Sequence, residues 1–143
     1  MILIDVNLLL YAYDRASPHN EAAAEWLEQV MSAHEPVGLP WATILAFLRI
    51  STHPRAPKPL PLSVAIHTTR NWLLQPSVSI IDPSERHWSI LSQLLPASGA
   101  RGALVTDAHL AALAIEHGAT LCTNDKDFTR FAGLRVRNPL RSP

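Results

Sequence analysis

Short apolar segments alternate with helical patterns along almost the whole chain, and this alternation limits the possible folds more than any other feature. The first segment, residues 2–6, is almost continuously apolar, as is typical of a strand that a sheet buries on both faces. Strands that alternate with helices form parallel sheets covered by helices. We therefore predict an α/β fold, a three-layer α/β/α sandwich around a central, mostly parallel sheet, in one domain of residues 1–143.

The individual elements are predicted from apolar runs, capping residues and prolines. Strands are expected at 2–6, 37–39, 78–81, 119–123 and 134–137. Helices are expected at 8–13, 18–32, 41–51, 63–75, 83–95 and 104–117, with a turn and short helix within 124–131. Ser17-Pro18 and Asp82-Pro83 each predict a helix start, because proline is favoured at the first helical position. Residues 96–102 are expected to form a loop.

Composition excludes several classes of protein. A single cysteine, Cys122, rules out an internal disulfide framework or a cysteine-cluster zinc site, and fits a reducing, cytoplasmic location. No apolar run approaches the ~20 residues that cross a bilayer, so no membrane association is expected. The net charge is zero, but residues 36–81 contain four bases and no acid, and residues 129–143 contain four more arginines. These blocks could be basic walls around an acidic cleft, or ordinary solvated surface charge.

Carboxylates stand at three places where a parallel sheet forms its sites. Asp5 lies near the end of the first strand, Asp125 and Asp127 follow the fourth, and Asp107 lies near the start of the Ala/Leu-rich helix. Ligand sites of parallel sheets lie at the carboxyl ends of the strands, where these acids would converge. Carboxylates without accompanying His or Cys ligands favour Mg²⁺ or Mn²⁺, ions that support attack of water on a phosphodiester. Helix capping by Asp5, a favourable helix-dipole position for Asp107 and a turn at Asp127 are the alternatives.

Three segments carry a resemblance to a known family. They are Ile2-Leu3-Ile4-Asp5-Val6-Asn7-Leu8-Leu9, Thr106-Asp107-Ala108-His109-Leu110-Ala111-Ala112-Leu113-Ala114 and His117-Gly118-Ala119-Thr120-Leu121-Cys122-Thr123-Asn124-Asp125-Lys126-Asp127-Phe128. In order, spacing and overall length the chain resembles the PIN domains, and most of all the VapC ribonuclease toxins of type II VapBC toxin–antitoxin systems. The endings Phe128-Thr129-Arg130-Phe131 and Arg137-Asn138-Pro139-Leu140 are similar to one subgroup of these toxins.

The resemblance implies a PIN-like fold and a Mg²⁺- or Mn²⁺-dependent endoribonuclease. It also implies a cognate VapB-type antitoxin as partner and, in most members, a homodimer. By position, Asp5, Asp107 and Asp125 correspond to the catalytic, metal-binding acids, and Asp127 to a possible further acid. Asn7 and Thr123 correspond to polar residues that support the ligands.

One position departs from the family pattern. Many members carry a glutamate in a pattern like Leu-Ala-Glu-Leu-Xaa-Arg, and Phe47 stands in its place here. Asp127 or water could complete the site, or activity could be weak. A PIN domain that binds RNA or antitoxin without cleaving is therefore the alternative function. A phosphohydrolase with an aspartate nucleophile is less favoured, because Asn7 stands where such sites generally have a second aspartate.

Two further expectations concern binding. Arg49 is a candidate for holding a substrate phosphate, and a solvent-facing arginine at a helix end is the alternative. The first helices contain more apolar residues than a thin sandwich would obviously bury, which favours a helix–helix homodimer. These residues are Leu8, Leu9, Leu10, Tyr11 and Trp26.

Overall fold

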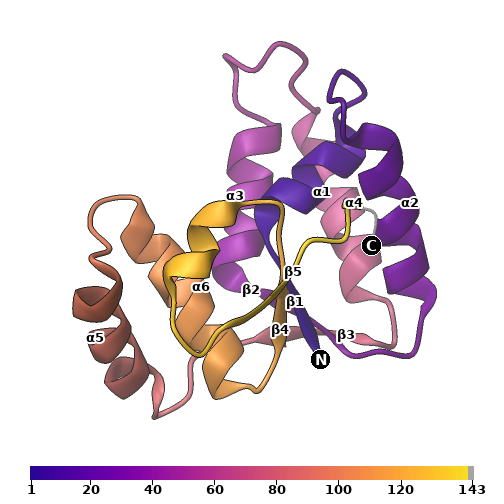
Figure 1. The fold of residues 1–143 in the computed structure, drawn as a ribbon. Helices are drawn as coiled ribbons and strands as arrows, with labels where there is room; N and C mark the ends of the chain where they lie inside the picture. The colour runs from indigo at the N-terminus through magenta and orange to yellow at the C-terminus, as the bar shows by residue number, and fades with distance from the viewer. Residues whose placement is uncertain (142–143) are drawn as a thin grey trace.

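A five-stranded parallel sheet forms the centre of the chain, with strand order β3-β2-β1-β4-β5 (Figure 1). The computed structural model describes residues 1–141. Ser142 and Pro143, which the predicted domain also includes, lie outside the described residues. The strands are β1 (Ile2–Ile4), β2 (Val37–Pro40), β3 (Val78–Ile81), β4 (Thr120–Cys122) and β5 (Arg135–Arg137). The predicted α/β sandwich around a parallel sheet is confirmed.

Helices cover both faces of this sheet. They are α1 (Val6–Tyr13), α2 (Asn20–Ser32), α3 (Trp41–Ser51), α4 (Leu62–Leu73), α5 (His87–Ser98) and α6 (Leu104–Glu116), with the 3-10 helix η1 (Lys126–Arg130). Successive side chains of a strand point to opposite faces, and β1 divides its residues accordingly. Leu3 packs in the core formed with α5 and α6, whereas Ile2 and Ile4 pack in the core formed with α1 to α4.

The register of the central strands decides which residues meet at the carboxyl edge. Ile4 of β1 pairs with Cys122 of β4, and the Asp5 backbone N–H donates to the Cys122 carbonyl at 3.0 Å. The next residues along the two strands are Asp5 and Thr123. The parallel pairing therefore brings these two polar side chains together, although 118 positions separate them in the sequence.

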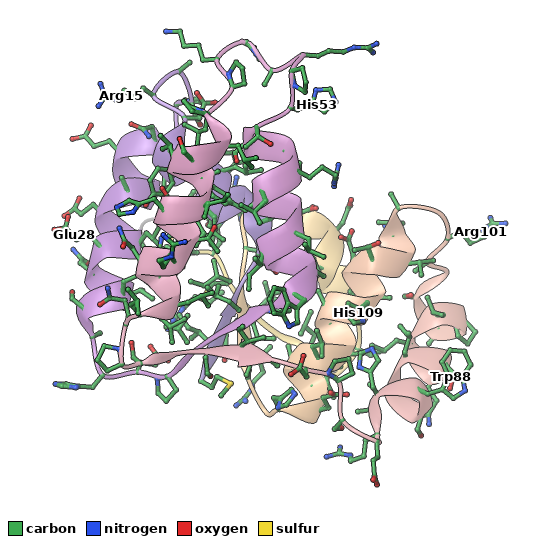
Figure 2. All side chains as sticks on the ribbon, turned by 180° about the vertical axis from the view of Figure 1, so that it is seen from behind. Arg15, Glu28, His53, Trp88, Arg101 and His109 are labelled. Atoms are coloured by element: carbon green, nitrogen blue, oxygen red, sulfur yellow. The ribbon has the colours of Figure 1, made fainter. Side chains whose placement is uncertain are left out.

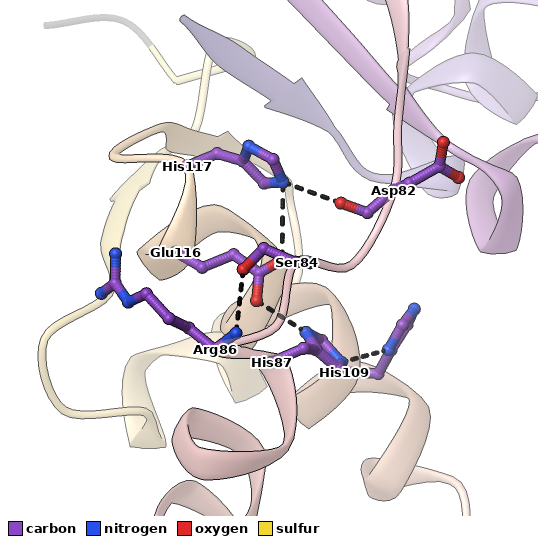
Figure 3. Close-up of polar contacts among 7 residues, drawn as sticks. All are labelled: Asp82, Ser84, Arg86, His87, His109, Glu116 and His117. Atoms are coloured by element: carbon purple, nitrogen blue, oxygen red, sulfur yellow. Dashed lines mark hydrogen bonds and ion pairs between the residues drawn. The ribbon is translucent and has the colours of Figure 1, made fainter.

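Helix α5 begins later than Asp82-Pro83 predicts. Its first residue is His87, and its last turn includes Pro96, so the loop predicted for 96–102 is wrong at its first residues. The physical reason is a long-range contact (Figure 3). The Ser84 backbone N–H donates to a carboxylate oxygen of Glu116 at 2.8 Å, which holds the residues before α5 against the end of α6.

Burial removes part of the basis for the predicted dimer. Leu8 and Leu9 are completely buried in the core of the chain itself, so neither is available to a second copy. The homodimer therefore stays a prediction that rests on the family resemblance. Among residues 1–141, no helix is both long enough and apolar enough to span a membrane.

Candidate active site

Asp5 is a buried carboxylate held at both oxygens. It is the N-cap of α1, and its Oδ1 accepts the Val6 N–H at 2.8 Å. Its Oδ2 accepts the Thr123 hydroxyl at 2.7 Å. Burial raises the pKa of Asp5 to about 6, against the lowering effect of these two hydrogen bonds, and the charges of Asp107 and Asp125 raise it further. The capping alternative for Asp5 is thus correct, yet the same carboxylate also lies within electrostatic reach of two other acids.

Thr123 connects the polar groups of this edge. Its side chain is buried, and its hydroxyl oxygen accepts the Asp125 N–H at 2.9 Å and the Asn7 amide at 3.4 Å while donating to Asp5. A hydroxyl group can donate one hydrogen bond and accept two, and this position uses all three. Three of the residues expected to form the site therefore meet through one side chain.

Asn7 contains an unsatisfied atom. Its Oδ1 is buried and finds no hydrogen-bond partner among residues 1–141. A buried amide oxygen without a partner costs free energy, so such atoms often mark a place where a water or ligand belongs. The position beside Thr123, in the first turn of α1, makes this oxygen available to an occupant of the acidic site.

Asp107, Asp125 and Asp127 complete the acidic group. Asp107 lies in the first turn of α6, and its pKa is raised by burial and then by the charges of Asp125 and Asp127, with Arg130 opposing the rise. Asp125 caps η1 by accepting the Asp127 N–H at 2.8 Å. The more exposed Asp127 lies 3.8 Å from the Arg130 guanidinium. None of the ion pairs described in residues 1–141 involves Asp5, Asp107 or Asp125.

The donor set suits a hard divalent cation. Carboxylate and amide oxygens without soft ligands match Mg²⁺ and Mn²⁺. Burial and neighbouring acids raise the pKa of both Asp5 and Asp107, so a cation at this place would relieve the unfavourable charge. The unsatisfied Asn7 oxygen fits as an acceptor for a water of such an ion. Within residues 1–141, no three acidic, histidine or cysteine side chains already surround a common metal position. Ligation would therefore require the carboxylates to close on the ion.

The other two predicted positions lie apart from this group. Phe47 is completely buried, with its ring centre 4.7 Å from that of Trp72 and 5.9 Å from that of Tyr13. An acid at this place would stand in an apolar, aromatic core. Arg49 is exposed in the last turn of α3, as expected of a solvent-facing arginine at a helix end. No contact described in residues 1–141 joins it to the acids.

A support for the Asp125 loop was not predicted. The Asn138 amide donates to Asn124 Oδ1 at 2.8 Å, and the Arg137 carbonyl accepts the Thr123 N–H at 3.0 Å. Both contacts come from β5 and the residue after it. In the sequence, the Arg137-Asn138-Pro139-Leu140 pattern indicates only a family resemblance. The pattern does not by itself indicate that β5 pairs with β4.

A second polar cluster joins α5 to α6 (Figure 3). The Glu116 carboxylate is fully buried beside His87 Nδ1 at 2.9 Å, and His87 Nε2 lies 2.9 Å from His109 Nδ1. Burial and the neighbouring His87 lower the pKa of His109. The cluster satisfies polar groups between two helices.

Comparisons with known proteins identify the family. Residues 2–134 match the profile of the PIN domain. The chain is 41% identical to Ribonuclease VapC37 of Mycobacterium tuberculosis over 140 residues, covering 97% of both chains. It is 40% identical to Ribonuclease VapC33 of the same organism over 142 residues, covering 99% of both. The chain belongs to the VapC ribonucleases of the PIN-domain family. The membership predicted from the three sequence segments is thus confirmed, as is its assignment as an enzyme.

Solved structures of other proteins share this fold. The VapBC2 complex of Rickettsia felis, bound to a promoter DNA fragment, matches with a TM-score of 0.72 at 20% identity, covering 96% of this chain and 98% of that one. The FitAB structure bound to the IR36 DNA fragment matches with a TM-score of 0.70 at 23% identity, covering 100% and 98%. At such identities the likeness shows the fold alone.

Proposed function

We propose that this VapC ribonuclease is a Mg²⁺- or Mn²⁺-dependent endoribonuclease that acts in the cytoplasm as the toxin of a toxin–antitoxin pair. The observation that carries the proposal is that Asp5 and Asp125 meet at Thr123, with Asp107 close enough for the charges of these acids to act on one another. A divalent cation stabilises carboxylates that burial and neighbouring negative charges would otherwise disfavour. Asp5, Asp107 and Asp125 would hold that cation, with Asp127 as a further acid.

The chain's own residues would prepare this site for phosphodiester hydrolysis. When bound, the cation supplies Lewis acidity and activates the attacking water. Val6 N–H and the Thr123 hydroxyl fix the orientation of Asp5, so its remaining lone pairs point in defined directions. The free Asn7 Oδ1 would accept a hydrogen bond from a water in the site and orient it.

Cleavage of purified RNA tests the function. Total RNA is incubated with the protein and Mg²⁺ or Mn²⁺, and Asp5→Asn and Asp107→Asn are compared with Asp82→Asn, an exposed acid after β3. We expect discrete fragments from wild type and Asp82→Asn, and at least a hundredfold slower cleavage in both site variants and in EDTA, the scale of losing a charge-stabilising group. Equal cleavage by Asp5→Asn and wild type would refute the assignment of the acids.

The alternative is a PIN domain that binds RNA or an antitoxin without cleaving it. The burial of Phe47 in an aromatic core favours it, because the family glutamate is missing and nothing acidic replaces it at that place. Retained RNA binding with no fragments under any metal condition would support this alternative. The aspartate-nucleophile phosphohydrolase would instead leave a trapped acyl-phosphate on Asp5.

A VapB-type antitoxin is the proposed protein partner. Structural neighbours include the VapBC2 complex of Rickettsia felis and a toxin–antitoxin complex from Klebsiella pneumoniae. Co-expression with a VapB-type antitoxin, followed by size-exclusion with light scattering, tests the partner and the homodimer together. A free monomer at micromolar concentration in both samples would contradict both.

A further inference from the structure

A pocket of about 370 Å³ lies between α2 and the C-terminal segment, outside the acidic group. The side chains of Trp26, Val30 and Pro139 supply apolar walls, and Gln29, Glu35 and Arg137 supply polar groups. A volume of this size accommodates a small organic ligand, and such sites combine flat apolar surfaces with a few directed polar groups.

The pocket is connected to the proposed active site through the backbone of β5. Arg137 lines the pocket, and its carbonyl oxygen accepts the N–H of Thr123, the residue that holds Asp5. The next residue, Asn138, binds Asn124 in the loop that carries Asp125. The segment that supplies one wall of the pocket therefore also supports the loop that carries Asp125.

The polar groups of the pocket form an adjacent acceptor and donor. Glu35 Oε2 lies 3.8 Å from Arg137 Nη2, and each side chain is about half exposed, at 49% and 50%. A separation of 3.8 Å is longer than a hydrogen bond, and Arg137 Nη2 also lies 3.7 Å from the Cys122 sulfur. The carboxylate oxygens and the remaining guanidinium N–H groups are therefore left to bind a ligand. The ligand that fits carries two neighbouring donors beside an acceptor, on a flat aromatic ring.

Among the four RNA bases, guanine has this arrangement. Its N1–H and N2 amino group are adjacent donors for a carboxylate, and its O6 and N7 are acceptors that arginine binds. Adenine, cytosine and uracil each present a single donor group at the corresponding edge. The side chain of Trp26 offers a surface on which an unpaired base stacks, as proteins that recognise single-stranded RNA do.

We propose that this pocket binds a guanine base of the RNA substrate, with Glu35 and Arg137 as specificity-determining residues. The inference rests on the proposed ribonuclease function for its biological substrate, but the binding of the base itself does not require cleavage.

Nucleotide binding in EDTA tests the pocket separately from the acidic site. The full chain is titrated with GMP, IMP and AMP, followed by ligand-observed NMR and by tryptophan fluorescence. IMP differs from GMP only in lacking the N2 amino group, so we expect it to bind about tenfold more weakly, the scale of one charge-assisted hydrogen bond. AMP should bind more weakly still. The fluorescence change should disappear in Trp26→Phe.

Variants identify the residue that reads the base. Glu35→Gln should lower GMP affinity to that of IMP, because the amide offers one acceptor in place of two. Glu28→Gln is the matched control, since Glu28 is exposed on α2 and does not line the pocket (Figure 2). Both variants should unfold at the wild-type temperature, because both side chains are exposed.

The outcomes distinguish this proposal from the proposed function. Cleavage of RNA without any preference of the protein for GMP over IMP would overturn the pocket assignment and leave the ribonuclease standing. GMP selectivity without RNA cleavage would support the pocket and refute the nuclease. If GMP fails to bind and Glu35→Gln weakens antitoxin binding instead, the pocket belongs to a protein partner and the proposal is wrong.

Discussion

Ionised Asp5 should destabilise the folded chain, because burial raises its pKa from 3.8 to about 6. The folded state therefore prefers the protonated form more than the unfolded state does. The stability contributed by protonated Asp5 is fully present below its unfolded pKa of 3.8, and it is lost as the pH rises through about 6. At roughly 1.4 kcal/mol per pH unit, the ionised side chain costs about 3 kcal/mol at neutral pH.

Asp5→Asn removes the ionisation while keeping the shape of the side chain. In EDTA at pH 7.5 we expect this variant to be more stable than wild type by about 1–3 kcal/mol, the lower value allowing for weakened hydrogen bonds. For a chain of this size the gain corresponds to roughly 3–10 °C in melting temperature. At pH 4.5 the contribution of ionisation should shrink to about 1 kcal/mol.

Chemical denaturation followed by circular dichroism at pH 4.5, 6.0 and 7.5 measures this difference. The control variant Asp82→Asn changes an exposed acid, so its stability should stay within about 0.5 kcal/mol of wild type at every pH. An Asp5→Asn variant whose stability relative to wild type does not grow between pH 4.5 and 7.5 would refute the reasoning. In that case burial would not be what perturbs Asp5.

Three other changes have defined expected outcomes. Thr123→Val keeps the side-chain shape but removes the hydroxyl that binds Asp5 and the Asp125 N–H. The free energy of unfolding should therefore fall by about 1–3 kcal/mol, and RNA cleavage should become slower. Phe47→Glu places a carboxylate in a fully buried apolar core, so it should lower the free energy of unfolding by several kcal/mol and leave Mg²⁺ affinity unimproved. Phe47→Leu should lower it much less. Tighter Mg²⁺ binding by a folded glutamate variant would contradict this expectation. Glu116→Gln should lower stability by about 1–3 kcal/mol without changing RNA cleavage, because the carboxylate binds Ser84 and His87 between α5 and α6. Slower cleavage at unchanged stability would contradict this structural role.

The helices and strands were largely predictable because their signals are local. The apolar run at β3 predicted Val78–Ile81 with its observed bounds, and the Ala/Leu-rich pattern predicted α6 to within one residue. Local signals were insufficient where a distant residue competed. Asp82-Pro83 has the pattern of a helix start, but the buried Glu116 carboxylate binds the backbone at Ser84 and delays α5 until His87.

The sequence by itself placed Asp5, Asp107 and Asp125 at strand ends and at a helix start, since the alternation of elements determines where each acid falls. Only the tertiary structure decided that β1 lies beside β4 and that β4 lies beside β5. That order brings Thr123 to Asp5, Asn138 to Asn124, and the Arg137 side chain to the pocket beside α2. The physical reason is that strand order follows from how helices pack on the two faces of the whole sheet, whereas local patterns report only the conformation of neighbouring residues.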